Sequence, residues 1–225
     1  MLCQIFRLRK VPSYGQIDAD YAVQLRSAQA DGPIYMLGLE KFRPDVNQGA
    51  ARAGTHRRAD HSYAPIPLLT AAGAALCFAA DVVASSGGWD RVAVIGYPTR
   101  RSFVELAYEP QFLNWHSAKE VRLERSTVMA MLPAGNLPAP ASSGRILLEA
   151  WAGPTPALLA EGPASIFDVE GTVIGDGRQW SGIRYTPIEA GTSLPLRSAT
   201  PGYQALLLEP TIERWRWPSA QCPGQ

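Results

Sequence analysis

The feature that most constrains the fold is a repeated order of apolar segments in the two halves of the chain. Each half opens with a glycine followed by an apolar run, and two more such runs joined through glycines come after it. Glycine-rich joints between β-branched runs favour β-hairpins. The corresponding segments are residues 32–39, 74–84 and 91–97 in the first half, and 144–151, 165–174 and 181–185 in the second.

Matching landmarks occur at the same spacing in both halves. Trp89 and Trp180 follow the two glycine-rich joints. The number of residues between them equals the number between Pro110 and Pro201 and between Phe112 and Tyr203. The Pro-x-Phe and Pro-x-Tyr pairs are expected to begin the second helix of each half. The fourth strands are predicted at residues 127–132 and within 213–217.

Each half therefore reads β-α-β-β-α-β, and the predicted fold is α+β. Most of the strand segments are apolar on both faces, so each sheet needs a cover on both sides. The half's own helices would cover one face and the other half's sheet the second. We expect two tandem ferredoxin-like units that form a pseudo-dimeric α/β barrel within one chain. The expected division is residues 1–135 for the first half, a 136–144 linker, 145–218 for the second half and a 219–225 tail.

Composition narrows the partners that the chain can have. The formal net charge is +1 and charged residues make up 18% of the 225 residues. Such a balance gives no basic surface for nucleic acid. The sequence shows no signal peptide and no apolar run long enough to span a bilayer. The three cysteines, Cys3, Cys77 and Cys222, form neither a disulfide framework nor a metal motif. We expect a cytoplasmic protein with no nucleic-acid or membrane partner.

Several stretches resemble the DUF1330 family of the dimeric α/β-barrel superfamily. Residues 89–103 read WDRVAVIGYPTRRSF, residues 109–112 read EPQF and precede His116, and residues 32–43 read GPIYMLGLEKFR. The resemblance covers about residues 16–134. Gly38 stands where that family usually has Asn, and Glu40 where it usually has Leu. The resemblance implies the barrel architecture; its superfamily includes cofactor-independent monooxygenases, cyclases, isomerases and haem enzymes, so it does not select a reaction.

His116 is the first candidate for acid/base chemistry. The spacing of Phe112, Trp115, His116 and Lys119 predicts a helix with Phe112 and His116 on one face, toward the sheet. An imidazole among apolar neighbours can act as a general acid or base. The alternative is that His116 hydrogen-bonds a carbonyl or carboxylate and only fixes the helix. Trp115 and Phe112 are predicted to line an apolar ligand pocket.

Polar residues on the central strands supply further candidates. Glu40 and Tyr35 are expected to assist His116, and Tyr97 and Asp81 to contact the substrate. On a regular strand Glu40 shares a face with Gly38, whereas Tyr35 belongs to the opposite face. The alternative for Glu40 is a solvent-exposed ion pair with a neighbouring Lys or Arg.

The remaining histidines offer weaker sites. His61 is predicted on the first helix, where it could contact substrate or simply pack. His56, His61 and a carboxylate such as Asp60 or Asp81 could hold a metal, although structural zinc shows tighter Cys/His pairs. His116 or His61 could serve as a haem ligand.

Three functional hypotheses follow from the sequence. The first is a small-molecule enzyme without cofactor that performs proton transfer, such as isomerase, cyclase or lyase chemistry, or cofactor-free oxygenation, on an apolar or aromatic substrate. The second is a ligand-binding or structural protein without catalysis. The third is a haem- or metal-dependent enzyme. The expected partner is a small molecule, and the pseudo-dimer within one chain leaves room for a homodimer.

Overall fold

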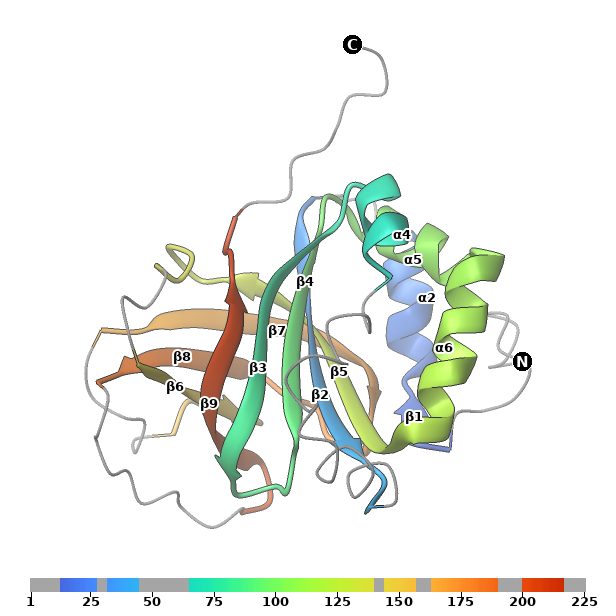
Figure 1. Ribbon diagram of the computed structural model, residues 1–225. Helices are drawn as coiled ribbons and strands as arrows, with labels where there is room; N and C mark the ends of the chain where they lie inside the picture. The colour runs from blue at the N-terminus through green and yellow to red at the C-terminus, as the bar shows by residue number, and fades with distance from the viewer. Residues whose placement is uncertain are drawn as a thin grey trace.

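Eight antiparallel strands close into a single β-barrel in the computed structural model (Figure 1). The model describes residues 13–27, 32–44, 65–139, 144–156, 163–189 and 200–216. Around the barrel the strands follow the order β7-β5-β2-β4-β3-β9-β6-β8, and pairing of β8 with β7 closes the ring. The two-residue β1 pairs with β7. The strands are β1 (Gln16–Ile17), β2 (Ile34–Phe42), β3 (Ala75–Ser85), β4 (Arg91–Tyr97), β5 (Leu123–Pro133), β6 (Arg145–Trp151), β7 (Ser165–Gly175), β8 (Gly182–Ile188) and β9 (Tyr203–Glu213).

Four helices of the described residues cover one side of this barrel. They are α2 (Ala19–Ser27), α4 (Ile66–Ala71), α5 (Arg100–Tyr108) and α6 (Pro110–Arg122). Figure 1 shows them gathered beside β2, β4 and β5, on the side of the barrel away from β6 and β8. All four come from the first half of the chain, and the described residues from 144 onward contain no helix. The helices of the described residues thus come from the first half alone, and they cover the outer face of β2, β4 and β5 and also contact β7 of the second half.

The predicted fold class is wrong. We expected two ferredoxin-like βαββαβ units that form a pseudo-dimeric α/β barrel, and the structure is instead a closed antiparallel β-barrel with few helices. Strands of the two halves hydrogen-bond directly, β5 to β7 and β3 to β9, so that the sheet is continuous. Closure leaves no free sheet edge along the ring, and the strands satisfy their backbone groups without a second helical layer.

The second half differs from the prediction at Pro201 and Tyr203 in particular. Gly202 has a φ of +85°, a conformation that suits glycine in a turn, and Tyr203 begins β9. Pro201 thus precedes a strand, and the helix predicted there is wrong. The strand predicted within 213–217 is also wrong, because β9 ends at Glu213. The Pro-x-aromatic pattern opens a helix at Pro110 but not at Pro201.

The strand segments themselves lie where the sequence predicts them. Six apolar runs correspond to β2, β3, β4, β6, β7 and β8, and residues 127–132 fall within β5. The two glycine-joined pairs form antiparallel contacts, β3 with β4 and β7 with β8. Trp89 and Trp180, each just before the second strand of its pair, are both buried. Local pattern therefore predicted the strands well, although the global arrangement was misjudged.

The barrel interior is filled by side chains. Buried residues from eight strands form one cluster, in which Tyr35, Phe78, Phe167 and Tyr185 surround Trp215 at ring-centroid distances of 5.5 to 6.0 Å. Aromatic pairs at such distances add to the stability that burial provides. Cys77, fully buried in this cluster, is the small hydrophobe that the sequence predicts. A packed interior leaves the outer face of the barrel as the place for a site.

A second apolar layer lies between the helices and the outer face of the barrel. Helix α5 begins at a capping box, in which Thr99 Oγ1 accepts from Ser102 N at 2.9 Å and Ser102 Oγ accepts from Thr99 N at 3.3 Å. A polar network then fixes this layer to the sheet. Tyr21 on α2 and Arg100 on α5 both donate hydrogen bonds to Glu170 on β7, at 2.9 Å to its Oε1.

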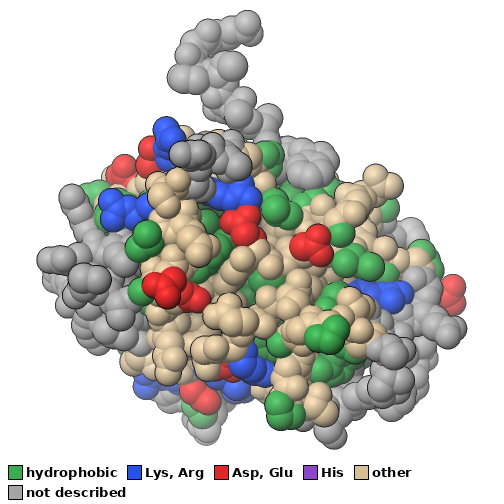
Figure 2. All heavy atoms as spheres, turned by 180° about the vertical axis from the view of Figure 1, so that it is seen from behind, with side chains coloured by type: hydrophobic (Ala, Val, Ile, Leu, Met, Phe, Trp, Pro, Cys, Tyr) green, Lys and Arg blue, Asp and Glu red, His purple; other side chains and the backbone are tan. Residues whose placement is uncertain are grey.

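Surface properties are unremarkable. On the face seen in Figure 2, basic and acidic side chains are interspersed among the residues that the structure describes. None of the helices in the described ranges has both the length and the hydrophobicity needed to cross a bilayer.

Candidate functional site

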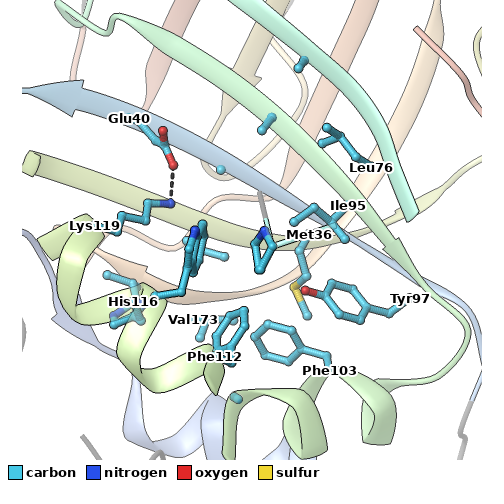
Figure 3. A pocket seen from close by; sticks show the side chains of 18 of the residues that line it. Met36, Glu40, Leu76, Ile95, Tyr97, Phe103, Phe112, His116, Lys119 and Val173 are labelled. Atoms are coloured by element: carbon cyan, nitrogen blue, oxygen red, sulfur yellow. Dashed lines mark ion pairs between the residues drawn. The ribbon is translucent and has the colours of Figure 1, made fainter. Parts of the chain in front are cut away.

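A cavity of about 190 Å³ lies between the outer face of the barrel and the helices (Figure 3). An engineered apolar cavity of about 150 Å³ holds benzene, so a ligand with one aromatic ring is of suitable size. Most of the wall is apolar. It is lined from the strands by Ile17, Met36, Gly38, Glu40, Leu76, Ala79, Arg91, Ala93, Ile95, Tyr97, Val128, Val173, Ile174, Thr211 and Ile212, and from other elements by Pro65, Phe103, Ala107, Phe112, Leu113, Trp115, His116 and Lys119.

The floor of the cavity is a row of small residues across neighbouring strands. Gly38 on β2 pairs with Val128 on β5 and with Ala93 on β4, and Ala93 pairs in turn with Ala79 on β3. Ala79 pairs with Ile212 on β9, which completes the row. Side chains of one cross-strand row lie on the same sheet face. The small members in the middle leave the space that the cavity occupies.

The roof is helix α6, which stands off the sheet. None of its residues is fully buried, although Phe112, Trp115 and His116 face the cavity. Direct packing onto the sheet would bury such an apolar face completely. Partial exposure of these three side chains therefore reflects the space beneath the helix.

An ion pair forms the polar end of the cavity. Glu40 on β2 and Lys119 on α6 are joined through Glu40 Oε1, as the dashed line in Figure 3 shows. Only 5% of the Glu40 side chain is exposed. Its Oε2 atom is buried and has no hydrogen-bond partner among the described residues. A buried carboxylate oxygen without a hydrogen-bond partner is costly, and the ion pair with Lys119 offsets part of the cost of burying the Glu40 charge.

A second cation lies next to Glu40. Arg91 on β4 is the cross-strand partner of Glu40, lines the cavity, and approaches Asp81 Oδ1 to 3.9 Å through its Nη2 atom. The polar end of the cavity thus combines one buried carboxylate with the ammonium of Lys119 and the guanidinium of Arg91.

The opposite end of the cavity is apolar and aromatic. Figure 3 shows Met36, Tyr97, Phe103 and Phe112 together at this end, away from Glu40. The rings of Tyr97 and Phe103 meet edge to face with centroids 5.2 Å apart. Burial raises the pKa of the Tyr97 hydroxyl, which therefore stays protonated at neutral pH. The ligand's apolar part would lie at this end.

His116 is hydrogen-bonded to Tyr14, a buried residue that precedes β1. The bond joins His116 Nε2 to the Tyr14 hydroxyl. Burial and the positive charge of Lys119 lower the pKa of His116 to about 4, and Glu120 opposes this in part. The imidazole is thus neutral at pH 7, and a group with so low a pKa is a weak general base. The bond can fix α6 as the alternative expected, but its partner is the hydroxyl of Tyr14 and not the carbonyl or carboxylate that was predicted.

The structure brings five of the predicted site residues to the cavity: His116, Glu40, Tyr97, Trp115 and Phe112.

Tyr35 and Asp81 are not among the described residues that line the cavity. Tyr35 points into the barrel interior, where its hydroxyl donates to the carbonyl oxygen of Arg216 at 2.7 Å. Asp81 pairs with Arg91 beside the cavity without lining it. His61 lies outside the described residues.

Sequence reasoning missed three polar residues at or next to the site. Lys119 was placed on the helix of His116 but not in the site, although it lies one turn after His116 and so on the same helix face. Tyr14 carries no motif, and only the fold brings it to His116. Arg91 begins a predicted strand two residues from Ala93, and strand alternation could have placed it on the cavity face.

In the described part of the structure, no group of residues supports the metal hypothesis or the haem hypothesis. Over the described ranges, no three His, Cys, Asp or Glu side chains are grouped as metal ligands would be. His56, Asp60 and His61 of the predicted metal set lie outside those ranges. His116 Nε2 is bonded to Tyr14, and a cavity of about 190 Å³ is much smaller than a porphyrin requires.

Comparison with known proteins adds little. No protein-family model and no curated protein matches the chain. A crystal structure of the RPA0582 protein of unknown function from Rhodopseudomonas palustris matches 55% of this chain and 99% of its own, with 20% identity and a TM-score of 0.41. A structure of methylated RPA0582 protein matches 54% and 96%, with 22% identity and a TM-score of 0.40. Structural similarity with a TM-score near 0.4 supports no inference about function.

Proposed function

We propose that the protein is an enzyme that binds a small, mostly apolar molecule in the cavity and exchanges a proton with it through the Glu40 carboxylate, without an organic cofactor. The observation that carries this proposal is the Glu40 carboxylate, which is buried in a mostly apolar cavity wall and is ion-paired with Lys119. Isomerisation, cyclisation and elimination all begin with such a proton transfer.

The surroundings of Glu40 suit a general base. Lys119 pairs with Oε1 and stabilises the negative charge of the carboxylate. The apolar wall excludes water, and electrostatic interactions are stronger in such a site. His116, neutral and bonded to Tyr14, would position α6 and the ligand while Glu40 takes the proton.

The resemblance to the DUF1330 family stays a prediction, and it offers no support for Glu40 as the base, because that family usually has Leu at this position. Glu40, Phe112 and His116 stand in or beside the resembling stretches, and all three line the cavity. Gly38, at the position where that family usually has Asn, contributes open space to the floor.

Elimination of 1,2-benzisoxazole tests the proposal without knowledge of the natural substrate. A base removes the proton on C3, the N–O bond breaks, and 2-cyanophenolate forms and absorbs in the near ultraviolet. A positioned general base contributes about 10²- to 10⁴-fold. We expect the native protein to accelerate the reaction and Glu40→Gln to lose most of that acceleration. The control Glu124→Gln alters an exposed carboxylate on β5 that is not part of the cavity and should leave the rate unchanged.

Ligand binding without turnover is the second candidate, favoured by the bond between His116 and Tyr14. Equal elimination rates for the native protein and Glu40→Gln, together with saturable binding of small aromatic compounds, would contradict the enzymatic proposal and support this one.

A further inference from the structure

We infer that the natural ligand is an aromatic carboxylate, with one ring at the apolar end of the cavity and its carboxylate held by Arg91 and Lys119 at the polar end. Two cationic side chains that keep accessible surface in the cavity wall are the observations behind it. The inference rests on the proposed function, because it names the class of ligand that the same cavity takes.

The charged groups that a ligand can reach at the polar end are mainly the two cations. The side chains of Arg91 and Lys119 line the cavity, and 13% and 16% of their surface is exposed. The Glu40 side chain is only 5% exposed, its Oε2 atom is buried, and its Oε1 atom is paired with Lys119. A polar group of the ligand therefore meets N–H donors at this end and should be a hydrogen-bond acceptor.

Both cations lie next to Glu40, and this places them close enough together to hold one anionic group. Arg91 on β4 is the direct cross-strand partner of Glu40, and such partners have Cβ atoms about 4.5–5.5 Å apart. Lys119 reaches the same carboxylate from α6 through its ion pair. A guanidinium has five N–H donors and an ammonium three, so each can keep its protein partner and also donate to a ligand carboxylate.

The charge of the cavity wall selects an anion. The ionised side chains among the described lining residues are two cations, Arg91 and Lys119, and one anion, Glu40. Asp81 lies 3.9 Å from Arg91, but it is not a lining residue and is 43% exposed, so solvent screens much of its charge. A ligand carboxylate would balance the remaining positive charge. An ammonium group would add to it in a site of low polarity, where like charges repel strongly.

The remaining wall fits a single ring. The apolar end presents Met36, Tyr97, Phe103 and Phe112, and Trp115 adds a further aromatic side chain. Aromatic rings favour edge-to-face and offset contacts with one another. The cavity of about 190 Å³ exceeds the roughly 150 Å³ that holds benzene by little more than a substituent. These walls thus accommodate one substituted ring, with its carboxylate at the polar end.

Binding of benzoate and nitrobenzene at pH 7 tests the inference by calorimetry. The two compounds have nearly the same shape, but only benzoate carries a net charge. We expect the native protein to bind benzoate more tightly than nitrobenzene. Arg91→Met should weaken benzoate binding about tenfold, while the affinity for nitrobenzene stays within twofold. Arg91→Lys keeps the charge and should weaken benzoate binding less than Arg91→Met does.

A matched control and the native protein itself keep the test decisive. Arg145→Met removes an exposed arginine of β6 that does not line the cavity, and it should bind both compounds as the native protein does. If the native protein binds benzoate no more tightly than nitrobenzene, the carboxylate class is wrong, and this comparison needs no variant. If Arg91→Met weakens both compounds equally or neither, the carboxylate does not contact Arg91 and the inference is also wrong.

The outcomes separate this inference from the proposed function. Elimination of 1,2-benzisoxazole that depends on Glu40 would leave the proposed function standing even if the carboxylate class is wrong. Preferential binding of benzoate that depends on Arg91, without elimination that depends on Glu40, would support the ligand class and contradict the enzymatic proposal.

Discussion

Gly38 on β2 and Ala93 on β4 lie opposite each other, and together they form the lowest part of the cavity floor. A Cβ atom added at Gly38 would come no closer than 3.8 Å to any atom outside its immediate neighbours, and the nearest would be the carbonyl oxygen of Ala93. The space above this glycine is therefore open, and a larger side chain there would enter the cavity.

Filling the floor should abolish ligand binding without unfolding the protein. We expect Gly38→Leu to lose measurable benzoate binding, because its side chain would occupy the space of the ring. Gly38→Ala should retain binding and gain about 0.5–1 kcal/mol of stability, since glycine in a strand is less favourable than alanine. Calorimetry and urea denaturation measure the two effects. Gly135→Leu, in an exposed loop with open space around it, is the control; unchanged benzoate affinity in Gly38→Leu would contradict the assigned floor.

The pKa of His116 should respond in opposite directions to two neighbouring charges. Lys119 lowers this pKa and Glu120 raises it. We therefore expect Lys119→Met to raise the pKa above about 4 and Glu120→Gln to lower it further. Titration of the imidazole carbon-bound protons by NMR, with assignment by His116→Gln, gives both values. Shifts of the same sign in the two variants would show that the helix does not hold these charges around His116 as described.

The free energy of unfolding should decrease as the pH is lowered, because His116 is buried as a neutral imidazole. Its folded-state pKa of about 4 lies below the unfolded value of 6.5, so the unfolded chain binds the proton more readily. The stabilisation is complete above pH 6.5 and declines as the pH falls toward 4, by about 3 kcal/mol in total. Urea denaturation between pH 7 and pH 4 should show a smaller decline for His116→Gln than for the native protein. Parallel curves for the two proteins would contradict burial of a neutral imidazole.

The network at Glu170 should hold the helices on the barrel. Hydrogen bonds from Arg100 and Tyr21 lower the pKa of the Glu170 carboxyl, although partial burial raises it. Glu170→Gln leaves the largely buried Arg100 without its counter-ion, and we expect a loss of about 1–3 kcal/mol at pH 7.

The acid behaviour of Glu170 provides the check on this network. Because its folded-state pKa is depressed, its contribution is full above pH 4.5 and disappears as the pH falls through the lower folded-state value. The difference in unfolding free energy between the native protein and Glu170→Gln should therefore shrink in acid. Glu105→Gln, an exposed carboxylate on α5, serves as the control. A difference independent of pH would contradict an ionised Glu170 at this contact.

The sequence predicts local elements of this fold better than it predicts pairings between strands far apart in the chain. Runs such as 91–97 predicted strands correctly, because apolar β-branched segments bounded by glycine are local signals. The ferredoxin-like prediction failed because it assumed that the second half repeats the helices of the first. Pro201 was expected to open a helix like that at Pro110, but Gly202 makes a turn and Tyr203 starts a strand. Closure of the sheet through β5–β7 and β3–β9 is a long-range pairing that no local pattern reveals.

The same distinction applies to the site. Strand alternation correctly predicted that Glu40 and Tyr35 lie on opposite faces of the sheet. Helix spacing correctly predicted that Phe112 and His116 share one face of their helix. Tyr14 could not be predicted, because it reaches His116 only through the folded chain. The missing partner at Glu40 Oε2 is likewise a property of the packed structure, since the sequence shows a carboxylate but not which of its oxygens is satisfied.

The rate of 1,2-benzisoxazole elimination in the native protein and in Glu40→Gln tests the central claim most directly. The account predicts that the native protein accelerates the reaction and that Glu40→Gln loses most of the acceleration. Equal rates for the two proteins would contradict it.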